Sequence, residues 1–122
     1  MAARLNASRY YETYSGHEVV HLQQVHGVLR PRSERMIFFA GDSSLDNKYW
    51  FSGSASALNG YEDVLSPPQM KQDVCYWVNS ECVRRQEKVC CLNTAVEASS
   101  LNSRSCCCLL GQDEFIRDHI QR

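Results

Sequence analysis

Apolar residues in the first third of the chain recur at the spacing of a helix. Between residues 17 and 29 they fall at intervals of three and four, which gives one apolar face: Leu22, Val25 and Leu29, with Val28 beside them. Pro31 follows, and the residue before a proline is pushed out of helical geometry, so we expect the helix to stop near Arg30. Residues 1–35 are therefore predicted to be an N-terminal extension with an amphipathic helix.

Two short apolar runs, at residues 36–40 and 89–92, have strand character. Each is too short for a helix and contains β-branched, aromatic or small apolar residues between polar segments, which is typical of a buried strand. Helices are predicted over residues 69–79 and 112–120, with a small-residue loop at 52–56 and a charged turn at 84–88. The order helix, strand, helix, strand, helix predicts an α/β fold.

The composition limits the range of functions. An apolar content of 43% and a charged content of 22% over 122 residues indicate one soluble globular domain. A net charge of −1 gives no electrostatic reason to expect binding to nucleic acid or to an anionic membrane. We expect no membrane span, because no apolar run is long enough, and we expect a cytoplasmic protein, because the N-terminus lacks the apolar core of a secretory signal.

The chain contains seven cysteines, and five of them stand in adjacent groups. Adjacent cysteines can rarely both be bridged within one compact domain, so a disulfide framework is not expected. We predict reduced, buried thiols.

The first predicted strand runs directly into Gly41-Asp42-Ser43. In open α/β sheets, ligands and catalytic groups collect at the carboxyl ends of the strands. A serine held at a strand-to-helix turn is a candidate nucleophile, and Asp42 can hold such a turn by accepting hydrogen bonds from backbone N–H groups. Ser43 and Asp42 are therefore candidate site residues, and the alternative for Ser43 is the N-cap of the next helix.

The stretch from Phe38 to Ser43 resembles the first conserved block of the GDSL-type (SGNH) hydrolases, in which an apolar strand runs into Gly-Asp-Ser. The resemblance implies a three-layer α/β fold of the flavodoxin-like type. It also implies hydrolysis of small-molecule esters through a serine acyl-enzyme, with Ser43 as the nucleophile and with no metal or cofactor.

A second stretch, after the strand at 89–92, resembles the family's second block, which reads roughly Asn-x-Gly-Val-x-Gly-x-Thr. Asn93, Ala95, Val96 and Ala98 occupy those positions, with alanine in place of both glycines. In the family the second glycine donates a backbone N–H to the oxyanion. The resemblance therefore assigns Ala98 as a backbone oxyanion donor, because an alanine keeps that N–H.

Two further family blocks have no match in the sequence. Neither Gly-x-Asn-Asp nor Asp-x-x-His is present, and Asp118-His119 are adjacent, so their side chains point in different directions on a helix. We therefore expect residues 36–122 to form the N-terminal half of such a domain, truncated after the second strand and its following helix. The open sheet edge of that half would pair with a missing C-terminal half or a partner chain, and the alternative is a catalytically silent interaction module.

A competing motif, His-Glu-x-x-His, spans residues 17–21. It is the zinc signature of many metalloproteases, in which two histidines share one face of a helix and the glutamate acts as general base. Its ligands would be His17, Glu18 and His21 in a zinc-dependent hydrolase. No third ligand follows at a matching spacing, and the alternative is an amphipathic helix with His17 and Glu18 on its exposed face.

Overall fold

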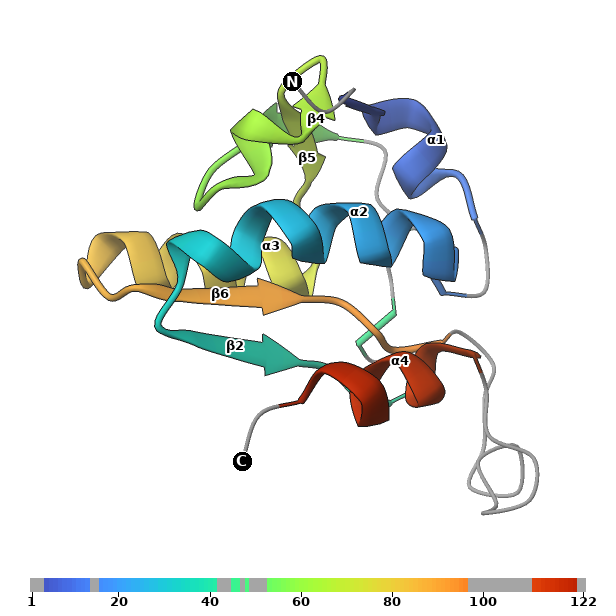
Figure 1. The fold of residues 1–122 in the computed structure, drawn as a ribbon. Coiled ribbons are helices and arrows are strands. Elements are labelled where there is room, and N and C mark those ends of the chain that lie inside the picture. Colours follow the sequence, from blue (N-terminus) through green and yellow to red (C-terminus); the bar gives the residue numbers. More distant parts are fainter. Residues whose placement is uncertain are drawn as a thin grey trace.

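The computed structural model describes residues 4–13, 16–41, 45–46, 48, 53–96 and 111–120. These residues form a mixed α/β structure (Figure 1) whose helices and strands follow in this order: β1 (Leu5–Asn6), α1 (Ala7–Tyr11), α2 (Val19–Leu29), β2 (Arg35–Phe38), β3 (Ser54–Ser56), β4 (Leu65–Ser66), β5 (Gln69–Lys71), α3 (Val74–Arg84), β6 (Val89–Leu92) and α4 (Gly111–His119). Short 3₁₀ helices follow α2, at Arg30–Arg32, and precede β4, at Tyr61–Asp63.

The two predicted strands pair with each other. β2 and β6 form a parallel sheet in which Arg35 is opposite Val89 and Phe38 is opposite Leu92. Helix α2 packs on one side of this sheet, and α3 packs against β6 from the other side (Figure 1). The predicted α/β class is therefore confirmed at the level of a small parallel sheet with helices on both sides.

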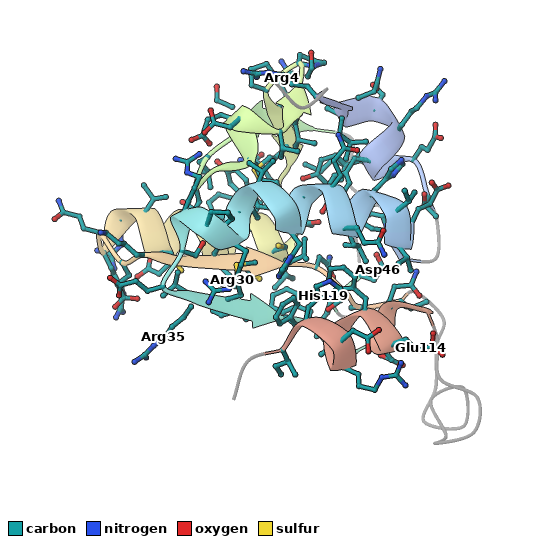
Figure 2. All side chains as sticks on the ribbon, in the orientation of Figure 1. Arg4, Arg30, Arg35, Asp46, Glu114 and His119 are labelled. Atoms are coloured by element: carbon teal, nitrogen blue, oxygen red, sulfur yellow. The ribbon has the colours of Figure 1, made fainter. Side chains whose placement is uncertain are left out.

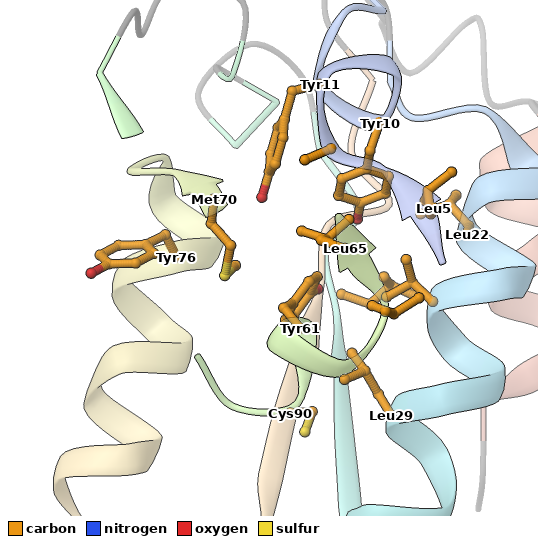
Figure 3. Close-up of a cluster of buried hydrophobic side chains, with 14 of the residues drawn as sticks. Leu5, Tyr10, Tyr11, Leu22, Leu29, Tyr61, Leu65, Met70, Tyr76 and Cys90 are labelled. Carbon is orange, nitrogen blue, oxygen red and sulfur yellow. The ribbon is translucent and has the colours of Figure 1, made fainter. Parts of the chain in front are cut away.

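Two smaller sheets pack above this unit. β1 pairs with β4 in parallel, and β3 pairs with β5 in the antiparallel sense. The aromatic and aliphatic side chains between them and α2 form the main core (Figure 3), which includes Leu5, Tyr10, Tyr61, Leu65 and Met70. This core joins residues from both ends of the sequence, because Phe115 of α4 also belongs to it.

Helix α2 confirms the predicted apolar face. Leu22, Val25 and Leu29 are completely buried. The helix begins at Val19 and ends at Leu29, where the Ser33 hydroxyl donates a hydrogen bond of 2.7 Å to the Leu29 carbonyl. The predicted end near Arg30 is thus confirmed, and Ser33 satisfies one carbonyl of the last turn. The expected reason is wrong, because Arg30 keeps helical backbone angles and the chain continues through Pro31 as a 3₁₀ helix.

The helix predicted over residues 69–79 is wrong in its first part. Residues 69–71 form β5, in which Met70 is buried opposite Ala55. The helix begins only at Val74, after Asp73 accepts a hydrogen bond of 2.9 Å from the Tyr76 N–H as its N-cap. A helix over residues 69–79 would place Trp77 on the same face as Met70 and Val74, toward the core, but Trp77 is 56% exposed.

Other boundaries also differ from the prediction. Residues 54–56, expected in a loop, form β3, and α3 extends to Arg84 into the predicted charged turn. The polar and aromatic N-terminal residues, for which the sequence showed no period, contain β1 and α1. β1 and β3 pair with distant segments, which a local pattern does not contain. The last turn of α3 has local support instead, because Glu81 pairs with Arg84 and Arg85.

The cysteines that the structure describes agree with the expected reduced state. Cys75, Cys82, Cys90 and Cys91 are buried free thiols. None of the helices within the described part of the chain has the length and apolar character needed to cross a membrane.

Candidate functional site

The carboxyl ends of β2 and β6 lie side by side, because the two strands are parallel and in register. Backbone and side-chain hydrogen bonds join the segment after β6 to the segment after β2. The Val96 N–H donates to the Gly41 carbonyl at 3.0 Å, and the Thr94 hydroxyl donates to the Phe39 carbonyl. The two sequence blocks that resemble the hydrolase family are therefore joined directly.

Asn93 connects the segment after β6 to Leu45, which follows the Gly-Asp-Ser sequence. Its amide nitrogen donates to the Leu45 carbonyl at 3.1 Å, and its amide oxygen accepts from the Ala95 N–H at 3.1 Å. Together with the bond between Val96 and Gly41, this holds the chain on both sides of residues 42–44.

Gly41 lies close to the Leu45 side chain. A Cβ atom built at this position would stand 2.7 Å from Cδ1 of Leu45, so an alanine here would require that flexible side chain to move.

A buried ion pair lies immediately after this turn. The Lys48 ammonium contacts the Asp46 carboxylate at 2.7 Å, and neither side chain is exposed to solvent. The second Asp46 oxygen accepts a hydrogen bond of 2.6 Å from the Gly16 N–H. Figure 2 shows Asp46 near the N-terminal end of α2, so this pair links the turn after β2 to the segment that leads into α2.

Asp73, the N-cap of α3, is a further buried acid in the same region. Burial raises the pKa of its carboxyl to about 6, although the hydrogen bond from the Tyr76 backbone, the Lys48 charge and a hydrogen bond from Asn93 oppose this rise. His17 is also buried, and burial together with the Lys48 charge lowers its pKa well below the usual value. Five buried polar residues therefore interact in this region: His17, Asp46, Lys48, Asp73 and Asn93.

The sequence-predicted site residues divide into two groups. Asp42, Ser43 and Ala98 lie outside the described residues. Asn93 lies at the junction of the two blocks, where it is 1% exposed. Both ends of its amide are engaged by the protein, so Asn93 supports the turn rather than presenting a donor to solvent.

The His-Glu-x-x-His motif does not lie on one helix. His17 precedes α2, and Glu18 is its N-cap residue, so the expected helical spacing is wrong. The expectation of an exposed His17 is also wrong, because the ring is 1% exposed and stacks on Tyr10 with centroids 3.8 Å apart. Its Nδ1 is 2.7 Å from the Tyr10 carbonyl. The described residues contain no group of three side chains arranged to hold a metal ion.

No protein-family model, curated protein or solved structure matches this chain. The likeness to the GDSL-type hydrolases is therefore a proposal, supported by the two sequence blocks and by the contacts between them.

Sequence reasoning missed the parts of the buried cluster that come from separate segments. Nothing in the local sequence around Asp46 predicts its buried pairing with Lys48. Asp73 did carry a local signal, since an aspartate before an apolar run is a typical N-cap.

Proposed function

We propose that this chain carries the nucleophile and the oxyanion-binding part of a GDSL-type serine hydrolase site that acts on small-molecule esters. One observation supports this most directly. The second block contacts both sides of the Gly-Asp-Ser turn, through the bond from Val96 to Gly41 and the bond from Asn93 to Leu45. A nucleophile and its oxyanion donors must be held together in this way, since stabilisation depends on donors fixed before the reaction.

In the proposed reaction, Ser43 attacks the ester carbonyl carbon through its hydroxyl oxygen. The backbone N–H groups of Ser43 and Ala98 donate to the oxygen that becomes negatively charged. The tetrahedral intermediate then expels the alcohol and leaves an acyl-enzyme, which water hydrolyses. Asp42 holds the turn, and Asn93 keeps the two blocks in register.

The sequence offers no match to the family block that supplies the general base. Acylation is therefore proposed to be slow, because a serine without a base is a weak nucleophile and only the oxyanion donors assist it. A strongly electrophilic probe is the suitable test, because its leaving group departs without first taking up a proton. We further propose a reducing compartment such as the cytoplasm, which fits the four buried free thiols.

The test is covalent labelling with a fluorescent fluorophosphonate. We expect slow labelling of the intact chain, loss of labelling in Ser43→Ala and retained labelling in Ser44→Ala, which removes the neighbouring hydroxyl as a matched control. Circular dichroism of each variant checks that it is folded. Equal labelling of Ser43→Ala, or no labelling of a folded wild-type chain, would show that the proposal is wrong.

A further inference from the structure

Helix α4 packs against α2 through contacts at both of its ends. At the start of α4, Gly111 approaches the Val19 side chain, and the Gln112 amide donates to the His17 carbonyl at 2.8 Å. At the end of α4, the ring of His119 contacts the ring of His26 on α2, with centroids 4.7 Å apart. Figure 2 shows His119 where α4 approaches the end of β2.

Aromatic rings surround His26 at this contact. Its ring centroid lies 5.7 Å from that of Phe115 on α4 and 6.1 Å from that of Phe38 on β2. Phe115 in turn stacks on His119, with centroids 4.1 Å apart. Two imidazoles and two apolar rings therefore share one contact between α2, α4 and β2. Stacked and edge-to-face arrangements of this kind stabilise neutral aromatic rings.

The His26 ring is poorly placed to carry a positive charge. Its Nε2 atom is buried, and none of the described residues offers it a hydrogen-bond partner. A protonated imidazole carries an N–H on both nitrogens, so protonation would leave a buried charged donor unsatisfied. Burial accordingly lowers the pKa of His26, and the neighbouring His119 and Arg30 lower it further.

The surrounding charges add to this effect. The charged side chains that line the adjoining groove, together with His119, are two arginines and one glutamate: Arg30, Arg35 and Glu34. On α4, Arg117 and Asp118 pair with each other at 3.1 Å and are exposed. β2 presents Phe38, which carries no charge. Protonation of both imidazoles would therefore bring two like charges together where guanidinium groups outnumber the carboxylate.

We infer that the contact between His26 and His119 is an acid-sensitive switch that holds α4 on α2 at neutral pH and releases it when the imidazoles take up protons. The released state is a local opening, in which α4 separates while the remaining elements stay folded. Release would expose Phe38 and Phe115 and break the hydrogen bond from Gln112 to His17. This inference goes beyond the proposed hydrolase chemistry and does not depend on it, because it uses only contacts among α2, α4 and β2.

The direction of the pH effect follows from the lowered pKa of His26 in the docked state. Once α4 is released, His26 recovers the ordinary imidazole pKa of about 6.5. Docking is therefore strongest above that pH and weakens as the pH falls below it. Between about pH 7.5 and about pH 5.5, the equilibrium constant for opening should rise by up to about tenfold.

The test is amide hydrogen exchange at these two pH values, corrected for the intrinsic pH dependence of exchange. We expect the protection of α4 to fall by up to about tenfold on acidification. Helix α3 is the internal reference, and it should keep its protection because it packs against β6.

Three variants sharpen the test. His26→Gln replaces the imidazole by an amide that does not ionise, so the protection of α4 should become nearly equal at the two pH values. His119→Gln should reduce the pH effect, because His26 then takes up its proton without a second imidazole beside it. His21→Gln is the matched control on α2, since the His21 ring faces Glu18 and Tyr10 instead, and it should behave as the wild type.

Three results would overturn the inference. The first is equal protection of α4 in the wild type at the two pH values. The second is a pH effect of unchanged size in folded His26→Gln, or in folded His119→Gln if the first variant does not fold. The third is a loss of protection that α3 shares, which would indicate global unfolding through the buried His17 instead.

Discussion

At the scale of single residues, Asp73 should make stability depend on pH. Its pKa is about 6 in the folded protein and near 3.9 in an unfolded chain, so folding favours the protonated acid. The stabilisation is present below pH 4 and is lost as the pH rises through 6. Asp73→Asn keeps an N-cap side chain but cannot ionise. We therefore expect the unfolding free energy of wild type, relative to this variant, to fall by up to about 3 kcal/mol between pH 4 and 7.

Urea unfolding of both proteins across this range measures the effect. The difference in unfolding free energy between the two proteins is needed, because His17 makes stability change with pH in the opposite direction. Its pKa is lowered well below the usual value by burial, so stability falls as the pH drops below about 6.5, and both proteins share that loss. Parallel stability curves for wild type and Asp73→Asn would contradict the prediction.

Removal of only one partner of the buried Asp46–Lys48 ion pair should strongly destabilise the protein. In Lys48→Met the Asp46 carboxylate stays buried with the Gly16 N–H but without its cation. We expect this variant to lose about 3–5 kcal/mol of unfolding free energy. The double variant with Asp46→Asn should recover part of that loss, since no uncompensated charge remains. A double-mutant cycle by chemical denaturation measures the coupling, and additive losses would be inconsistent with it.

Residue-scale prediction from sequence worked where one segment contained all the information. Leu22, Val25 and Leu29 lie on one helix, and their spacing alone identified the buried face. The buried polar cluster could not be found in this way, because the partner of each member is fixed by tertiary packing. Gly16 and Asp46, for example, are thirty positions apart.

At the scale of elements, Asn79 joins α3 to β6, because its amide accepts from the Cys91 N–H at 2.8 Å and donates to the Cys91 carbonyl at 3.0 Å. It also accepts a hydrogen bond of 2.8 Å from the Asn59 side chain. Its replacement leaves the buried Cys91 N–H without this acceptor, whereas the Cys91 carbonyl keeps the Tyr61 hydroxyl and the Asn59 amide keeps the Val89 carbonyl. We expect Asn79→Ala to cost about 1–3 kcal/mol of unfolding free energy, which is the cost of one buried unsatisfied group. The Cys91 amide should also exchange its hydrogen faster.

Ser80→Ala is the matched control on the same helix, and it should change stability by no more than about 0.5 kcal/mol. Thermal or urea unfolding compares the two variants, and hydrogen exchange reports on Cys91. Equal stability of the two variants would mean that Asn79 does not hold β6 to α3.

Element-scale prediction failed where two elements shared one apparent pattern. Met70, Val74 and Trp77 are spaced as on a helix, yet Met70 belongs to β5, and the helix begins only after Asp73. Periodicity records spacing and does not detect a boundary within it. The strands at 35–38 and 89–92 were recognisable because each is a short apolar run between polar segments.

At the scale of the whole molecule, the sequence predicted the α/β class and the two strands of the β2–β6 sheet, but not the two smaller sheets. β1, β3 and β4 have at most three residues each, which is too few for a period to be visible. Of the candidate site, the parallel pairing that brings the two blocks together follows from the strand predictions. Asp42, Ser43 and Ala98 lie outside the described residues, so the chemistry at Ser43 depends on the labelling experiment.

The parallel ladder also has a consequence for synthesis on the ribosome. β2 pairs with a strand that begins at residue 89, so more than fifty residues must be synthesised after residue 35 before its pairing partner is present. At about 5–20 residues per second, this synthesis takes roughly 3–10 seconds. During that time an apolar strand is exposed to other nascent chains, and closing so long a loop adds an entropic cost. Early protection of residues 35–38 by a chaperone would therefore raise the yield of native protein.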